Sequence, residues 1–240
     1  MSRASARTFR LAVRWLTRQE AVVLLAALGI ALALLVFAKT AAEMSEGDLR
    51  EFDESVLQSL RRSDDSHVPI GPPWLVQAAI DVTALGGTAV LALFLAIVVG
   101  YLVLDRRYAS AGLVVVATAG AGGLGELLKL WFARQRPDIV PHLVDVGSAS
   151  FPSGHAMLAI VTYVTLGAML ARFVQRRRTR TYCMVVALLM ALLVGVTRVY
   201  LGVHYPTDVL AGWSAGLAWA LLCWLVARYL QYRGRVEGPG

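Results

Sequence analysis

Long apolar runs alternate along the chain with short polar segments rich in arginine. The apolar runs fall within 19–40, 73–104, 110–133, 154–174, 182–198 and 206–230. A helix needs about 20 predominantly apolar residues to cross the hydrocarbon core of a membrane. We therefore predict an all-α fold, in which a polytopic membrane protein forms a single six-transmembrane-helix bundle.

The run at 73–104 is too long for one straight span, because a helix rises only about 1.5 Å per residue. Gly86 and Gly87 divide it. We place the second span at 88–104 and expect the preceding residues, 74–85, to form a lead-in helix at the membrane interface or beside the bundle.

The basic leader, residues 1–18, carries five arginines before the first apolar run. Such a leader can belong to a cleaved signal peptide. This run is longer than a usual signal peptide core, and no small-x-small cleavage site follows it. We therefore favour an uncleaved anchor, transmembrane helix 19–40.

The segment 41–72 is strongly acidic, and within it Leu49, Phe52, Val56 and Leu60 recur at helical spacing. This pattern is typical of an amphipathic helix on a membrane surface. It equally fits a solvated connector with one packed face, and the sequence leaves both interpretations open.

Composition supports the membrane assignment and narrows the partners. Hydrophobic residues make up 58% of the 240 residues, which is too many for an ordinary soluble domain. The net charge of +7 comes almost entirely from arginines between the apolar runs, so membrane topology explains it better than nucleic-acid binding. Cys183 and Cys223 lie inside apolar runs, and no Cys/His or paired-carboxylate motif predicts a metal or another cofactor.

The distribution of arginine and lysine predicts the orientation of the bundle. With the N-terminus in the cytoplasm, 15 of the 23 basic residues fall on the cytoplasmic side. Both chain ends are then cytoplasmic. The ends of the third to sixth spans that carry polar clusters face the extracytoplasmic side of an inner or plasma membrane.

The first polar cluster contains Lys129 and Arg136, followed by Pro137. Seven residues separate the two cations, which would place them on one face of a helix that Pro137 ends. Two cations on one face can hold a phosphate. Taken alone, the pattern also fits basic side chains that extend toward the membrane interface.

The second cluster is Ser153-Gly154-His155 after a proline. Ser153 is a good helix N-cap, Gly154 allows close approach of an anion, and the free N–H groups of a helix start bind phosphate. His155 could give a proton to a leaving oxygen. An ordinary capped helix with an interfacial histidine is the alternative.

The third cluster contains Arg198, His204 and Asp208, with Pro206 suited to the first turn of a helix. Asp208 would then lie in that turn and could orient the imidazole of His204. The alternative is an interfacial arginine beside a helix start.

Together the clusters supply the groups needed for phosphoryl transfer without a metal. His204 would attack phosphorus and form a phosphohistidine, and His155 would protonate the departing oxygen. The cations that would hold the phosphate oxygens are Lys129, Arg136 and Arg198.

The order Lys-x6-Arg-Pro, Pro-Ser-Gly-His and Arg-x5-His-x3-Asp resembles the type 2 phosphatidic acid phosphatase superfamily of membrane lipid phosphatases, over residues 85–229. The resemblance implies a six-span bundle, an extracytoplasmic site and metal-independent hydrolysis of lipid phosphates. By position it makes His204 the nucleophile, Asp208 its partner and His155 the acid. It makes phosphate ligands of Lys129, Arg136, Ser153, Gly154 and Arg198.

Two features stand apart from the pattern. Thr197 occupies a position where the family usually has serine, and we expect little change because the hydroxyl is kept. Glu126 lies one helical turn before Lys129, where it could pair with a site cation or neutralise a charge within the bundle.

An enzyme is therefore the leading hypothesis, with membrane lipids around it and a lipid phosphate as substrate. Phosphatidic acid, phosphatidylglycerol phosphate and prenyl mono- or diphosphates would present the same headgroup chemistry. A lipid phosphotransferase, or a non-catalytic binding protein of the same fold, is the alternative. A transporter is disfavoured because its polar groups usually lie near the bilayer midplane. The sequence does not indicate the oligomeric state.

Overall fold

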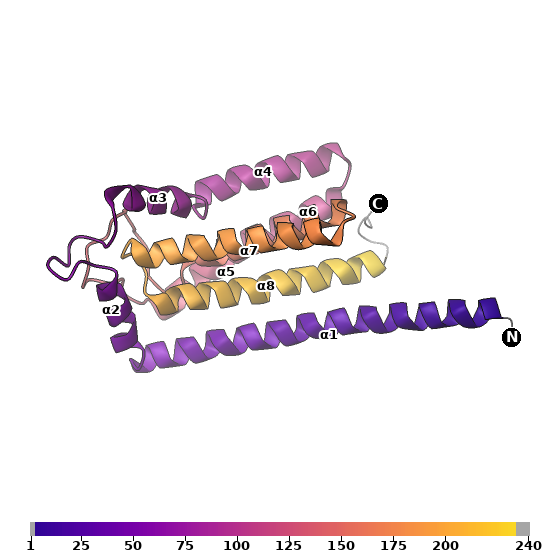
Figure 1. Ribbon diagram of the computed structural model, residues 1–240, viewed down its shortest axis with the longest axis horizontal. Coiled ribbons are helices and arrows are strands. Elements are labelled where there is room, and N and C mark those ends of the chain that lie inside the picture. The colour runs from indigo at the N-terminus through magenta and orange to yellow at the C-terminus, as the bar shows by residue number, and fades with distance from the viewer. Residues whose placement is uncertain (1–2, 234–240) are drawn as a thin grey trace.

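The computed structural model describes residues 3–233, which form eight α-helices (Figure 1). The helices are α1 (Arg3–Glu46), α2 (Arg50–Ser59), α3 (Pro73–Ala84), α4 (Thr88–Leu104), α5 (Tyr108–Phe132), α6 (Gly154–Phe173), α7 (Arg177–Tyr200) and α8 (Pro206–Tyr232).

Five of the described helices are long and apolar enough to cross a membrane: α1 over Glu20–Glu46, α5, α6 over Gly154–Ala171, α7 and α8. The pair α3 and α4 gives a sixth span if a helix bent by 44° is counted as one. The prediction of an all-α, polytopic membrane bundle is confirmed.

The break between α3 and α4 falls at the two adjacent glycines. A Cβ atom on Gly86 would lie 2.3 Å from Cγ1 of Val194 in α7 and 3.5 Å from Cβ of His155 in α6. The hydroxyl of Tyr163 in α6 donates a hydrogen bond of 2.9 Å to the carbonyl oxygen of Leu85, which the break leaves without a helical partner. The missing side chain of Gly86 therefore lets the break lie directly against the start of α6.

Helix α6 is central to the bundle and packs against α5, α7 and α8, while α1 runs along α8 (Figure 1). Two glycines of α8 allow a close approach to α6. A Cβ atom on Gly212 would lie 2.5 Å from the carbonyl oxygen of Ser153, and one on Gly216 would lie 2.8 Å from that of Met157. The first turns of α6 and α8 are therefore held together.

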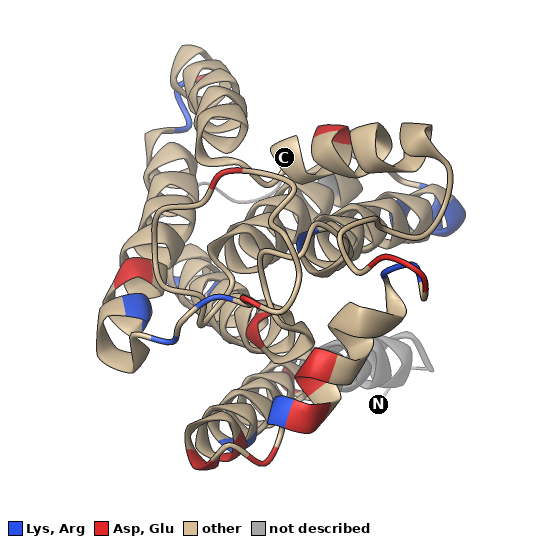
Figure 2. Ribbon diagram, turned by 90° about the vertical axis from the view of Figure 1, so that its left-hand side faces the viewer, with Lys and Arg blue, Asp and Glu red and all other residues tan. Residues whose placement is uncertain are grey.

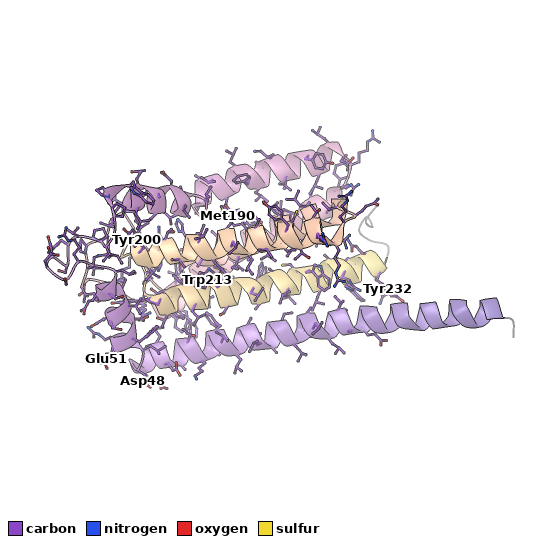
Figure 3. The ribbon with its side chains drawn as sticks, viewed as in Figure 1. Asp48, Glu51, Met190, Tyr200, Trp213 and Tyr232 are labelled. Atoms are coloured by element: carbon purple, nitrogen blue, oxygen red, sulfur yellow. The ribbon has the colours of Figure 1, made fainter. Side chains whose placement is uncertain are left out.

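One end of the bundle, here called the polar end, is formed by α2, by the loop 133–153 and by the turn 201–205. The N-terminal part of α1 and the C-terminal part of α8 lie at the opposite end (Figure 1). Viewed from the polar end, acidic residues gather on α2 and the neighbouring loops (Figure 2). Asp48 and Glu51 mark the corner where α1 gives way to α2 (Figure 3).

Helix α2 occupies the acidic segment and packs one of its faces onto the protein. Asp53 and Leu57 are its buried residues, whereas Phe52 is 53% exposed. Leu57 belongs to a buried apolar cluster with Val140 and Tyr205. Helix α2 therefore has the packed face that we expect if segment 41–72 is a connector packed on the protein.

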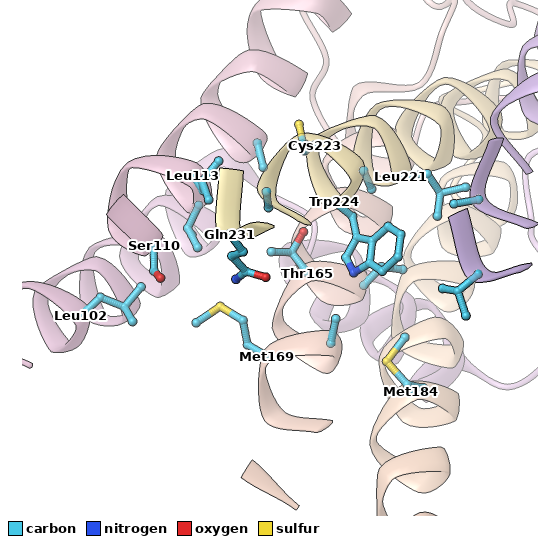
Figure 4. A pocket seen from close by; sticks show the side chains of 18 of the residues that line it. Leu102, Ser110, Leu113, Thr165, Met169, Met184, Leu221, Cys223, Trp224 and Gln231 are labelled. Atoms are coloured by element: carbon cyan, nitrogen blue, oxygen red, sulfur yellow. The ribbon is translucent and has the colours of Figure 1, made fainter. Parts of the chain in front are cut away.

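A cavity of about 460 Å³ lies between helices at the end opposite to the polar end (Figure 4). Apolar side chains such as Leu113, Met169 and Trp224 dominate its lining. The three polar clusters lie at the other end of the bundle, so this cavity is separate from the candidate active site.

Candidate active site at the polar end

The three polar clusters of the sequence meet at the polar end. The backbone N–H of Ser153 donates to the carbonyl oxygen of Asp208 at 2.9 Å, which joins the second cluster to the third. Nη1 of Arg136 donates to the carbonyl oxygen of Val203 at 2.6 Å and lies 3.3 Å from Nε2 of His204, which joins the first cluster to the third.

His204 lies in the short turn between α7 and α8 and is only 2% exposed. Its Nδ1 atom is 3.4 Å from Oδ2 of Asp208. An ionised carboxylate can only accept a hydrogen bond, so this contact favours the tautomer with the proton on Nδ1. Nε2 then carries the lone pair that a nucleophile requires, and Nη1 of Arg136 lies 3.3 Å from it in this structure.

Asp208 is fully buried in the first turn of α8, directly after Pro206 and Thr207. Its Oδ2 atom accepts hydrogen bonds from the hydroxyl of Ser150 and, at 2.9 Å, from the backbone N–H of Tyr205. Its Oδ1 atom accepts from Nη1 of Arg134 at 2.6 Å. These donors and the helix dipole stabilise the charged carboxylate and fix its direction.

The first cluster differs from its predicted geometry. Helix α5 ends at Phe132, and Ala133 takes a left-handed conformation with φ of 44°. The prediction that Lys129 and Arg136 share one helical face is therefore wrong. Beyond the end of the helix, Arg134 binds Asp208 in α8 and Arg136 binds the carbonyl oxygen of Val203 in the turn 201–205.

The two cations of this cluster nevertheless converge on one hydroxyl group. Nζ of Lys129 is 3.2 Å from Oγ of Ser148, and Nη2 of Arg136 is 3.5 Å from the same atom. Arg136 also donates from Nε to the carbonyl oxygen of Ser148 at 2.7 Å. Nζ of Lys129 is 2.8 Å from Oε1 of Glu126, so this glutamate pairs with a cation of the site.

The second cluster begins α6 as the sequence predicts. Ser153 is the N-cap, and its Oγ accepts from the backbone N–H of Ala156 at 3.5 Å. A Cβ atom on Gly154 would lie 3.2 Å from Nζ of Lys129, so Gly154 leaves this cation room at the helix start. His155 follows in the first turn and has Lys129, Arg136, Arg198 and His204 as electrostatic neighbours.

Phe151 anchors the loop that precedes α6. It is fully buried, and its ring centroid is 4.9 Å from that of Phe132 at the end of α5 and 5.9 Å from that of Phe37 in α1. This aromatic cluster fixes Ser150 and Ser153, which lie on either side of Phe151 and Pro152, against the helices of the bundle.

Arg198 is a buried cation near the end of α7, only 4% exposed. Its Nη1 donates to Oγ1 of Thr83 at 3.3 Å, and its buried Nε has no partner. Among the described residues, no ion pair includes Arg198 or Arg136. A charge that is buried, as that of Arg198 is, or half-buried, as that of Arg136 is, is costly without a counterion, so both guanidinium groups favour an incoming anion.

The hydroxyl of Thr197, where a serine is usual, donates to the carbonyl oxygen of Val194 at 2.7 Å. It therefore bonds within its own helix.

Burial also sets the protonation state at the centre of the site. It lowers the pKa of His204 to about 4, with Asp208 opposing the shift and the charges of Arg136 and Arg198 adding to it. Burial lowers the pKa of the Arg136 guanidinium as well. His204 is therefore neutral, and able to act as a nucleophile, at neutral pH.

Several polar residues of the site were not assigned a role from the sequence. They are Asp53, Thr83, Arg134, Ser148, Ser150 and Thr207. Arg134 lies between Lys129 and Arg136 of the first cluster, and Ser150 lies just before the second cluster. Their positions in the sequence could therefore have indicated that they belong to the site. For Asp53 the sequence gives a weaker indication, because this acidic residue lies on the apolar face of the predicted helix in segment 49–60.

Comparisons with known proteins show what this chain is similar to. The PAP2 superfamily matches residues 110–232. The chain is 36% identical over 187 residues to phosphatidylglycerophosphatase B of Bacillus subtilis (strain 168), over 76% of this chain and 87% of that protein. It is 31% identical over 128 residues to an undecaprenyl-diphosphatase of Sulfolobus acidocaldarius, over 50% of this chain and 56% of that protein. A lipid A 1-phosphatase of Rhizobium johnstonii is 33% identical over 151 residues, over 53% of this chain and 55% of that protein.

Two solved structures share the fold. The crystal structure of a transmembrane PAP2 type phosphatidylglycerolphosphate phosphatase from Bacillus subtilis has a TM-score of 0.76 and 30% identity, over 84% of this chain and 96% of that chain. The crystal structure of Aquifex aeolicus LpxE has a TM-score of 0.55 and 23% identity, over 72% and 95%. The second likeness concerns the fold alone.

Proposed function

Because the chain belongs to the PAP2 superfamily, we propose that it is a phosphatase that hydrolyses lipid phosphates by transferring the phosphoryl group to Nε2 of His204. Its relatives are named phosphatidylglycerophosphatase, undecaprenyl-diphosphatase and lipid A 1-phosphatase. These names have a phosphate or diphosphate on a lipid in common, which supports the reaction class.

One observation carries the proposal: two guanidinium groups without counterions, the buried one of Arg198 and the half-buried one of Arg136, act on the buried, neutral His204, and that of Arg136 lies 3.3 Å from its Nε2. A phosphate bound by Lys129, Arg136 and Arg198 would replace Arg136 at Nε2 of His204 and bring phosphorus within reach of the lone pair. Attack forms the N–P bond and breaks the P–O bond to the lipid. Asp208 stabilises the imidazolium that develops, as a buried carboxylate does beside a catalytic histidine.

His155 completes the cycle in two steps. It gives a proton to the departing lipid oxygen, so that a neutral alcohol leaves. It then removes a proton from a water molecule, which attacks phosphorus and breaks the N–P bond. Inorganic phosphate is released, and both histidines return to their starting states. Attack by a second lipid alcohol instead of water would give a phosphotransferase, by the same chemistry.

The first test is phosphate release from a panel of lipids by the purified protein, with and without excess chelator. We expect hydrolysis to persist in chelator, because three cationic side chains supply the positive charge that the reaction needs. Phosphatidylglycerol phosphate leads the panel, followed by phosphatidic acid and prenyl mono- and diphosphates. The control is His204→Ala protein purified in the same way, which measures contaminating phosphatase. Loss of activity in chelator and recovery with magnesium would contradict the proposed mechanism.

We further propose that the polar end faces the extracytoplasmic side of the membrane. The distribution of basic residues supports this orientation, because 15 of the 23 fall on the opposite side under it.

Cysteine labelling in intact cells tests the orientation. In a background in which Cys183 and Cys223 are replaced by alanine, a cysteine at Pro141 should react with a membrane-impermeant maleimide. One at Arg178, in the arginine-rich start of α7, should react only after the cells are permeabilised. Activity of the cysteine-free protein is the control. The reverse labelling pattern would place the site in the cytoplasm.

A further inference from the structure

We propose that Asp53 of α2 is a positioning residue for the reaction, which sets the geometry of Asp208 through Arg134 and Thr207. The inference rests on the proposed function, in which Asp208 orients His204. Asp53 lies outside the segment 110–232 that matches the superfamily, in the acidic connector between α1 and α3.

Asp53 is fully buried, and the hydrogen-bond donors described at its carboxylate come from the site. Oδ2 accepts from Nη2 of Arg134 at 2.8 Å and from the hydroxyl of Thr207 at 2.6 Å, and Oδ1 accepts from the backbone N–H of Thr207 at 3.1 Å. Burying a carboxylate is costly unless a cation and hydrogen bonds compensate it. The cation, Arg134, and the hydrogen bonds from Thr207 both come from segments that lie next to the proposed nucleophile, His204.

Arg134 joins the two buried carboxylates. Its Nη2 binds Asp53, while its Nη1 binds Oδ1 of Asp208 at 2.6 Å and Oγ1 of Thr207 at 2.8 Å. Its guanidinium lies 4.2 Å from the ring centroid of Tyr205. The planar group is thus fixed at both edges and on one face, and a lysine could not reproduce this geometry.

This bridge determines which oxygen of Asp208 faces the nucleophile. With Oδ1 held by Arg134, Oδ2 is left for Ser150, the Tyr205 N–H and Nδ1 of His204. Without the charge of Asp53, Arg134 would be balanced by Asp208 alone. Asp208 would then be drawn toward Arg134 and would stabilise the imidazolium of His204 less.

The central test compares two substitutions on the same helix. Asp53→Asn keeps the size of the side chain but removes the charge and replaces one acceptor by a donor. Glu51→Gln removes the same charge from an exposed position of α2 and is the matched control. We expect Asp53→Asn to lower kcat roughly 10- to 100-fold, as loss of supporting hydrogen bonds typically does. KM should stay within about twofold, because Asp53 contacts no proposed phosphate ligand, and Glu51→Gln should match the wild type.

A double-mutant cycle with Arg134 shows whether the effect passes through the bridge. If it does, Asp53→Asn combined with Arg134→Gln should lose clearly less activity than the product of the two single losses. Multiplicative losses would overturn the proposal, because they would mean that Asp53 acts independently of Arg134.

Rapid-quench trapping of the phosphoenzyme distinguishes positioning from folding. A positioning role predicts a slower rate constant for phosphoenzyme formation with an unchanged amplitude per mole of total protein. A purely structural role predicts a lower amplitude with an unchanged rate constant, and that result would overturn the proposal, as would equal activity of Asp53→Asn and Glu51→Gln. If Asp53→Asn does not fold, Arg134→Lys probes the bridge from its other end and should show the same loss of rate constant.

Failure of the proposed function gives a different result. In that case either the wild type would release no phosphate and form no phosphoenzyme, or His204→Ala would still form one, whatever the behaviour of the Asp53 variants.

Discussion

His204→Ala is expected to abolish lipid phosphate hydrolysis, with a loss on the order of 10⁵- to 10⁶-fold, the scale reached when an enzyme loses its nucleophile. The variant keeps Lys129, Arg136 and Arg198, so it should still bind the substrate headgroup. It has no atom in place of Nε2 to accept the phosphoryl group, however, and no covalent intermediate can form.

The measurement is phosphate release together with acid-labile phosphoenzyme trapped by rapid quench from radiolabelled substrate. His67→Ala is the matched control, because His67 is an exposed histidine of the same end of the bundle. It should behave as the wild type. Recovery of trapped phosphoenzyme from His204→Ala would mean that another residue is the nucleophile.

His155→Ala is expected to slow hydrolysis of a lipid phosphate by roughly two to four decades, the usual contribution of a general acid. The same variant should lose far less activity toward nitrophenyl phosphate, because nitrophenolate leaves without protonation. His204 is intact in this variant, so the phosphoenzyme should still form from the activated substrate.

The measurement is the ratio of kcat/KM for the two substrates, in the wild type and in His155→Ala. The ratio cancels any loss of folded protein, which affects both substrates equally. An equal loss on both substrates would assign His155 a role in binding or structure and would leave the general acid unidentified.

Much of the fold follows from local features of the sequence. Apolar runs and their flanking charges predict where the spanning helices lie, and the glycine pair 86–87 predicts the break between α3 and α4, because both are properties of consecutive residues. The end of α5 does not follow in this way. Helical spacing and Pro137 predicted a helix through Arg136, but the helix ends at Phe132, and the two arginines of the next segment bind partners that lie far along the chain.

The same distinction applies to the candidate site. The eight residues predicted from the motifs lie at the polar end, and spacing within each motif was sufficient to select them. The residues that hold them could not be selected by spacing. Asp53 binds Thr207 across 154 positions of the chain and Arg134 across 81. Only the packing of α2 against the start of α8 brings these groups together.

The uncompensated charge of Arg136 and Arg198 also affects the end of the catalytic cycle. Under the proposed function, the cations that would bind a lipid headgroup would also bind free phosphate by the same forces, since hydrolysis leaves the phosphate oxygens in place. Interactions shared by substrate and product bind both and do not by themselves speed the chemical step. In the proposed cycle the enzyme therefore has to release an anion from two cations that have no counterion of their own among the described residues. We expect product departure to limit turnover once substrate is saturating, with inorganic phosphate acting as a competitive inhibitor.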